Sequence, residues 1–155
     1  MKKSKKKKIY DFNKMEVDRN RYALGLTWNI LHQKNVKQEL VDSGLTWEHR
    51  LPLINMRLKK LKYSYICLQE IDLDTVDQCF GHFKDIYHMV PNVQGKKHKS
   101  DIGCLTMLAK DHWDIIEKFE TSVGVHVLAH MKITDQKVWI CNVHLKKGYK
   151  SGQET

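Results

Sequence analysis

The stretch Tyr-Ile-Cys-Leu-Gln-Glu, at residues 65–70, is a short apolar run that ends in a carboxylate. Its length and composition are typical of a buried β-strand. The last side chain of such a strand turns toward the mouth of the sheet, so Glu70 is a candidate site residue. A glutamate at a strand end is more often a solvated edge residue, and the run alone leaves both readings open.

Two other apolar runs also carry polar side chains. Leu24–Leu31 contains Asn29, and Val138–Leu145 contains Asn142 and His144. Three strands that each deliver a metal-binding or hydrogen-bonding group are typical of a site where a hard cation assists phosphoryl transfer.

Five segments of the sequence occur in an order that resembles a known superfamily. They are Thr27–Leu31 (Thr-Trp-Asn-Ile-Leu), Trp47–Arg50 (Trp-Glu-His-Arg), Cys67–Glu70 (Cys-Leu-Gln-Glu), Gly103–Met107 (Gly-Cys-Leu-Thr-Met) and Asn142–Leu145 (Asn-Val-His-Leu). Together they resemble the endonuclease/exonuclease/phosphatase superfamily of magnesium-dependent phosphodiesterases, and within it the deadenylase (nocturnin-like) branch. The resemblance covers about residues 22–150.

The resemblance implies a role for each candidate. Glu70 matches the ligand of Mg²⁺, with Mn²⁺ as the alternative cation. Asn29 matches the amide that holds the metal-bound glutamate or the phosphate, and His144 matches the histidine that donates to a non-bridging phosphate oxygen. Asn142 lies beside His144 on the same strand and is counted with Asn29 and His144 as catalytic. Without the resemblance, Asn29 would also fit a turn and His144 would also fit a core. Arg50 is expected to anchor its helix to a carboxylate, with Trp47 packed beneath it.

Basic residues form two clusters in a chain of net charge +9. Six lysines lie within the first eight residues, and such a run predicts a disordered tail over residues 1–20. The tail fits a nuclear-localisation or nucleic-acid-binding arm, or a solubilising segment. Lys96, Lys97 and Lys99 lie in a polar loop beside the predicted site, where they are expected to bind substrate phosphate unless they are simply solvated.

Composition narrows the class of protein. At 155 residues and 41% hydrophobic content the chain is long enough for one domain with a core. No stretch approaches the about 20 apolar residues that a membrane span needs. The four cysteines include no Cys-x-x-Cys pair, which favours an intracellular, cytoplasmic or nuclear protein without disulfides.

Apolar periodicity predicts an α/β domain. Helices are expected at Trp47–Lys62, with a kink or a delayed start at Pro52, and at Asp74–Lys84. One mixed sheet of about six or seven strands is expected, with helices on one face and a β-α-β crossover between its first two strands. The expected strands are Tyr22–Leu31, Tyr63–Glu70, Ile86–Val90, Ile102–Ala109, Trp113–Glu120, Val123–Ile133 and Val138–Leu145, the last two forming an antiparallel hairpin.

Two further segments of the superfamily site do not occur in this sequence. They are a Gly-Asp-x-Asn segment and a terminal Ser-Asp-His segment, and only ten residues follow Leu145. We therefore expect residues 21–155 to be the N-terminal half of the superfamily's four-layer α/β sandwich. One apolar sheet face would then be left for a C-terminal half or a protein partner to cover.

The leading hypothesis is a fragment of a magnesium-dependent phosphodiesterase, a 3′–5′ exoribonuclease of the poly(A) deadenylase type acting on RNA. Its activity in isolation is in doubt, since half of the active site is missing. Alternatives are a phosphatase or phosphodiesterase acting on a dinucleotide or a 2′,5′-oligonucleotide, and a non-catalytic RNA- or protein-binding remnant. An unrelated α/β domain with accidental matches is the remaining alternative. None of these readings involves a membrane.

Overall fold

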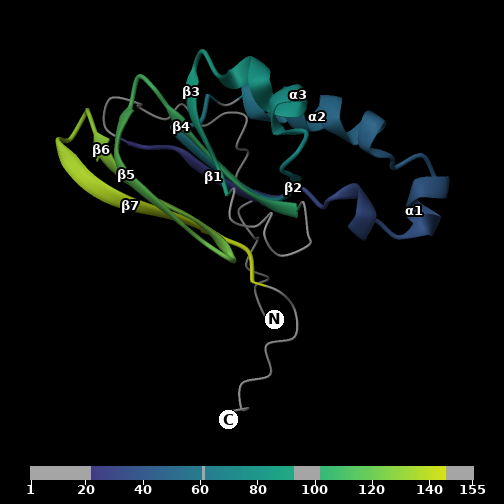
Figure 1. Cartoon of the computed structure of the whole chain (residues 1–155). Helices are drawn as coiled ribbons and strands as arrows, with labels where there is room; N and C mark the ends of the chain where they lie inside the picture. Colours follow the sequence, from purple (N-terminus) through teal and green to yellow (C-terminus); the bar gives the residue numbers. More distant parts are fainter. Residues whose placement is uncertain (1–21, 61, 93–101, 146–155) are drawn as a thin grey trace, which may run out of the picture.

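The chain folds into two β-sheets packed face to face, with helices against the outer face of one of them (Figure 1). The computed structural model describes residues 22–60, 62–92 and 102–145. The strands are β1 (Gly25–Asn29), β2 (Tyr65–Asp72), β3 (Tyr87–Pro91), β4 (Ile102–Ala109), β5 (Trp113–Thr121), β6 (Gly124–Met131) and β7 (Gln136–Val143). The helices are α1 (Gln38–Asp42), α2 (Trp47–Lys60) and α3 (Val76–Phe80), with 3-10 turns η1 (Gln33–Asn35) and η2 (Gly81–Phe83).

The first sheet has four strands in the order β1-β2-β4-β3 and is mixed. β1 and β2 are parallel and are joined through α2, which confirms the predicted crossover. β4 pairs antiparallel with both β2 and β3. The α/β class and a mixed sheet with helices on one face are therefore confirmed.

The number of strands in that sheet was predicted wrongly. β5, β6 and β7 form a separate antiparallel sheet, in which β6 and β7 make the predicted hairpin. The reason lies in β4, whose two edges are already paired with β2 and β3. The chain that leaves β4 therefore has no free edge beside it, and it folds over the face of the first sheet instead.

The helix-covered face of the first sheet forms one core. Ile66 and Leu68 of β2 pack against Ile54 and Leu58 of α2 and against Phe80 of α3. Side chains of this size contribute about 1.5–3 kcal/mol each when they are fully buried. Val76, Phe80 and Phe83 are buried, as the sequence predicted. α2 begins at Trp47 and continues through the exposed Pro52.

The opposite face of the first sheet is covered by the second sheet. Cys67 and Cys104 contact a cluster that includes Trp113, Val125 and Val127 from β5 and β6. The prediction that this apolar face would wait for a missing half or a partner was therefore wrong, because the chain itself supplies the covering strands.

Apolar surface is exposed elsewhere. A groove of about 550 Å³ opens between the β1 and β7 edges of the two sheets, lined in part by Leu26, Tyr65 and Ile140. On the outer face of the second sheet, Phe119 and Trp139 are 47% and 46% exposed and contact each other edge to face.

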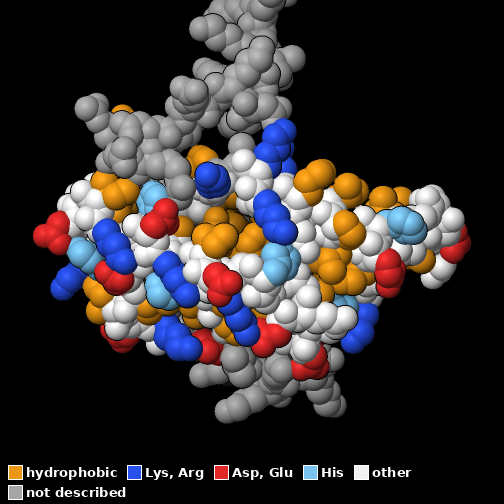
Figure 2. Space-filling view, turned by 90° about the horizontal axis from the view of Figure 1, so that it is seen from above, with side chains coloured by type: hydrophobic (Ala, Val, Ile, Leu, Met, Phe, Trp, Pro, Cys, Tyr) orange, Lys and Arg blue, Asp and Glu red, His pale blue; other side chains and the backbone are white. Residues whose placement is uncertain are grey.

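Charged side chains of both signs lie interspersed with apolar patches on the face drawn in Figure 2. The lysine-rich tail and the loop lysines at 96, 97 and 99 lie outside the described residues, so the expectations for them stay predictions. Within the described part of the chain, no helix has the length and apolar content needed to cross a membrane.

Candidate active site

Glu70 lies at an irregularity in β2. The register with β4 shifts between Gln69 and Ile71, and the backbone of Glu70 adopts a φ of 56°. Left-handed backbone is uncommon for residues other than glycine and is disfavoured by about 1–2 kcal/mol. Bulges of this kind redirect a side chain out of the regular alternation of a strand. The Glu70 carboxylate consequently points to the end of the sandwich.

Four groups surround this carboxylate. Asn29, at the end of β1, donates its Nδ2 to Oε1 over 2.7 Å. Asn35, the last residue of η1, donates its Nδ2 to Oε2 over 2.7 Å, and the backbone N–H of His32 donates to the same oxygen over 3.3 Å. His144, directly after β7, places its Nε2 3.4 Å from Oε1 of Glu70.

These contacts keep Glu70 ionised. Burial raises the pKa of its carboxyl, but the hydrogen bonds from Asn29 and Asn35, the charge of His144 and the backbone bond from His32 outweigh that effect. The pKa of Glu70 therefore lies below its ordinary value. The site presents a carboxylate that is negative at neutral pH.

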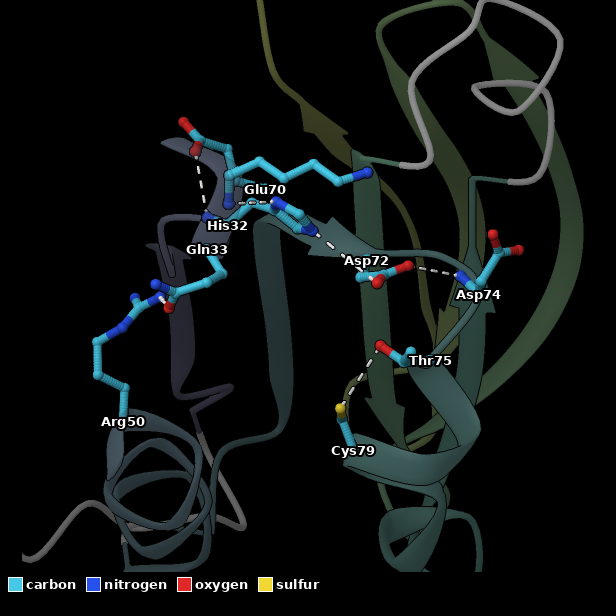
Figure 3. Close-up of polar contacts among 9 residues, drawn as sticks. His32, Gln33, Arg50, Glu70, Asp72, Asp74, Thr75 and Cys79 are labelled. Atoms are coloured by element: carbon cyan, nitrogen blue, oxygen red, sulfur yellow. Dashed lines mark hydrogen bonds and ion pairs between the residues drawn. The ribbon is translucent and has the colours of Figure 1, made fainter. Parts of the chain in front are cut away.

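Arg50 holds the segment that delivers two of these donors. Its guanidinium donates to the carbonyl oxygens of Ile30 and Leu31 over 2.9 and 2.8 Å. It also donates to Gln33 Oε1 over 3.1 Å (Figure 3). The guanidinium also lies 5.3 Å from the ring centre of Trp47. The expected packing with Trp47 is present, but the expected carboxylate partner was wrong, because among the described residues Arg50 donates to carbonyl oxygens. Leu31 itself has a φ of 56°, so this segment turns sharply just before it reaches Glu70.

His32 is a buried histidine that sequence reasoning missed. Its Nδ1 accepts the backbone N–H of Lys34 over 3.0 Å, and its Nε2 lies 3.9 Å from Asp72 (Figure 3). Burial lowers the pKa of His32, although Asp72 partly offsets the effect. A neutral ring that accepts at Nδ1 carries its proton on Nε2, toward Asp72. His32 thereby ties its turn to the end of β2.

Asn142 lies in a different, buried network. Its Oδ1 accepts from Gln69 Nε2 over 2.7 Å, and its Nδ2 donates to the carbonyls of Leu68 and Leu105 over 3.1 and 3.0 Å. Gln69 Nε2 also donates to Thr27 Oγ1 over 3.1 Å. This network joins β7 of the second sheet to β1, β2 and β4 of the first.

The structure thus brings three of the predicted site residues together, namely Glu70, Asn29 and His144. Asn142 sits behind them, in the interior, and its predicted contact with substrate stays a prediction. Asn35 was missed because the sequence around it is polar and irregular, with no motif to single it out. Only the folded turn at residues 30–35 brings it to Glu70.

The groups around Glu70 limit how a cation could bind there. Among the described residues, no group of three or more His, Cys, Asp or Glu side chains lies close enough to hold a metal ion. One ionised carboxylate flanked by amides remains. Mg²⁺ accepts such a site, because it keeps several waters and is commonly held by one or two carboxylates together with substrate phosphate. A hydrated divalent cation such as Mg²⁺ or Mn²⁺ is compatible with a site of this kind, with Glu70 as the residue that would hold it.

Comparisons with known proteins identify the fold. No model of a protein family matches the sequence, and no curated protein matches it. Among solved structures, the chain is similar to the human Nocturnin catalytic domain with bound sulfate (20% identity, 79% of this chain and 49% of that chain, TM-score 0.59). It is also similar to ANGEL2, a 2′,3′-cyclic phosphatase, in complex with adenosine-2′,3′-vanadate (19% identity, 78% and 41%, TM-score 0.62).

A third similar structure is the Bacteroides thetaiotaomicron mannosyl-6-phosphatase Bt3783, with 14% identity over 76% of this chain and 49% of that chain and a TM-score of 0.55. The chain spans about half the length, or less, of these structures. All three belong to the endonuclease/exonuclease/phosphatase superfamily, so the fold expected from the sequence resemblance is confirmed.

Proposed function

We propose that this chain carries the cation-binding part of a phosphoester hydrolase, with Glu70 as the ligand of Mg²⁺. The observation that carries the proposal is the surroundings of that carboxylate. Glu70 is held in left-handed backbone at a bulge, and amide donors from two segments far from it in sequence keep it ionised. Backbone strain of this kind clusters at functional sites.

The proposed roles of the surrounding residues follow from their contacts. Bound Mg²⁺ would neutralise phosphate charge and orient a water. Asn29 fixes the orientation of the carboxylate, because its Oδ1 accepts from Leu31 N over 2.9 Å while its Nδ2 holds Glu70. His144 has a side chain that is 37% exposed beside the carboxylate, so it is placed to donate to an incoming phosphate oxygen.

The finer proposal concerns the substrate. We propose poly(A) RNA, degraded from its 3′ end, with Lys96, Lys97 and Lys99 binding the phosphate backbone in an intracellular, cytoplasmic or nuclear setting. A dinucleotide or a 2′,5′-oligonucleotide is the alternative. Because the sequence lacks the Gly-Asp-x-Asn and Ser-Asp-His segments, we expect this chain by itself to bind such a substrate without rapid turnover.

Binding of a 5′-labelled adenosine oligoribonucleotide, followed by fluorescence anisotropy, tests the proposal. Affinity should be higher with Mg²⁺ than with a chelator, and Glu70→Gln should remove that difference. A non-catalytic RNA-binding remnant would instead bind with strong salt dependence and equally well in both conditions. Identical affinity with and without Mg²⁺, in the wild type and in Glu70→Gln, would overturn the proposal.

A further inference from the structure

Three hydrogen bonds and one longer contact surround the carboxylate of Glu70, and Oε2 accepts two of the hydrogen bonds. Two carboxylate oxygens offer about four lone-pair positions. Oε1 faces Asn29 at 2.7 Å and His144 at 3.4 Å, while Oε2 accepts from Asn35 at 2.7 Å and from the His32 N–H at 3.3 Å. Mg²⁺ bonds to a lone pair at about 2.0–2.1 Å. A donor N–H and a cation cannot use the same lone pair, so a cation that binds through Oε2 must displace one of its two donors.

The donors differ in how firmly they are held. Asn29 is fixed at both ends of its amide by Glu70 and Leu31. The N–H of His32 belongs to a buried backbone whose carbonyl accepts from Asn35 N over 2.8 Å. His144 makes a longer contact that is an ion pair only when its ring is protonated.

Of the two donors on Oε2, Asn35 is the one that can leave. The residue is exposed, at the last position of η1, and its Nδ2–Glu70 bond is the side-chain hydrogen bond it makes with the described residues. Rotation about its side-chain bonds would move the amide into solvent without disturbing the backbone. The segment that carries it stays anchored, because Arg50 holds the carbonyls of Ile30 and Leu31.

We propose that Asn35 is a displaceable amide latch on Glu70, which stabilises the carboxylate in the absence of a cation and is released when Mg²⁺ binds. The inference rests on the proposed function, since it assumes that Glu70 is the cation ligand. When no cation is bound, the Asn35 amide stabilises the charge of the Glu70 carboxylate. The same hydrogen bond weakens cation affinity, because its free energy is lost when the cation binds. A net hydrogen bond of the usual strength corresponds to about a 3–10-fold change in affinity.

Isothermal titration with Mn²⁺ tests the latch through affinity. Asn35→Ala should bind Mn²⁺ about 3–10-fold more tightly than the wild type, because no donor has to leave Oε2. Gln38→Ala is the matched control, since Gln38 donates its Nε2 to the Asp42 carboxylate over 2.7 Å and makes a similar amide–carboxylate pair away from the site. Gln38→Ala should leave Mn²⁺ affinity at the wild-type value.

A nuclear magnetic resonance titration with diamagnetic Mg²⁺ reads the displacement in the wild type, without any substitution at Asn35. The side-chain NH₂ signals of Asn35 should move to the positions of a solvated amide on saturation, while those of Asn29 stay hydrogen-bonded. Asn35 signals that keep their bonded positions at saturation would overturn the latch.

The outcomes distinguish failure of the proposed function from failure of the latch. If Glu70→Gln binds Mn²⁺ as tightly as the wild type, the proposed function fails. If Glu70→Gln loses binding while Asn35→Ala binds Mn²⁺ with unchanged or weaker affinity, the proposed function stands and the latch is refuted. Weaker binding by Asn35→Ala would mean that the amide assists the cation site rather than competes with it.

Discussion

Gln69 and Glu70 are neighbours in β2, and both are held by asparagine amides, yet the two arrangements differ in kind. Gln69 is neutral and belongs to a network with Asn142 that lies between the sheets. Glu70 is charged and meets Asn29 and Asn35 at the rim of the sandwich. A neutral, buried network in which the amides are satisfied stabilises a unique packing. The charged side chain of Glu70 is held by amides and keeps about a tenth of its surface exposed, at 11%.

The backbone shows the same contrast. Gln69 lies in register opposite Cys104, as a regular strand residue does. Glu70 leaves that register with a φ of 56°. Two adjacent residues therefore differ in backbone: Gln69 keeps the regular strand conformation and register, and Glu70 does not. The comparison teaches that residue 69 maintains the fold, while residue 70 carries the proposed chemistry. Each of the following experiments tests one side of that division.

Asn142→Ala should have the largest effect on stability. It removes three buried hydrogen bonds, which join Asn142 to the carbonyls of Leu68 and Leu105 and to the amide of Gln69. Each of these hydrogen bonds contributes about 0.5–1.5 kcal/mol, so we expect a loss of about 3 kcal/mol in the free energy of unfolding. Urea denaturation followed by circular dichroism measures it.

The double variant Gln69→Ala/Asn142→Ala serves as the control for this prediction. Because the two side chains share one network, the double loss should be smaller than the sum of the single losses. Strict additivity would show that Gln69 and Asn142 act independently. It would contradict the view that residue 69 maintains the fold through a shared network.

Glu70→Gln should produce the converse pattern, with a large loss of cation binding and a small loss of stability. Substitution of residues that only orient a metal ligand already costs about 10–100-fold in affinity, so loss of the ligand charge itself should cost about 100-fold or more. Titration calorimetry with Mn²⁺ and urea denaturation measure the two quantities on one sample. A loss of stability that exceeds that of Asn142→Ala, with cation binding retained, would make Glu70 a structural residue.

Sequence reasoning could identify Glu70, Asn29 and His144 because their positions are set by local features. Each lies at or near the end of an apolar run, and strands placed side by side bring their ends together. The crossover between β1 and β2 was predictable for the same reason, since an amphipathic helix separates two short apolar runs.

Other features depend on contacts between distant segments. Nothing in the residues of β5–β7 indicates that both edges of β4 are already occupied, so the second sheet could not be foreseen. The role of Asn142 changed for a similar reason. Its side chain is buried by the sheet-on-sheet packing and meets Gln69, a partner 73 residues away in the sequence. The turn that brings Asn35 to Glu70 is likewise held by Arg50 through backbone carbonyls, which leave no pattern in a sequence.

A glycine–alanine comparison at the two positions isolates the backbone contribution. Glu70→Gly and Glu70→Ala both remove the carboxylate, but only glycine adopts left-handed backbone without strain. Glu70→Gly should therefore be more stable than Glu70→Ala by about 1 kcal/mol. At Gln69, in regular strand backbone, the order should reverse, with the alanine variant more stable by about 0.5–1 kcal/mol. The same sign at both positions, measured by thermal or urea unfolding, would contradict the contrast in backbone.

The smallest expected effect is the pH dependence of stability that comes from Glu70. Burial raises the pKa of Glu70, but the two asparagines and His144 lower it by more. The pKa in the folded state therefore lies below the unfolded value of about 4.3. A carboxyl with a depressed folded pKa adds stability above its unfolded pKa and loses it as the pH falls through the folded pKa. Since Glu70→Gln cannot titrate, the stability difference between wild type and Glu70→Gln should be constant near neutral pH and shrink on acidification below about pH 4.3. Urea denaturation at pH 7 and pH 3 measures both differences. A difference that grows on acidification would place the pKa of Glu70 above its ordinary value, which would mean that burial, and not the surrounding amides, controls this carboxylate.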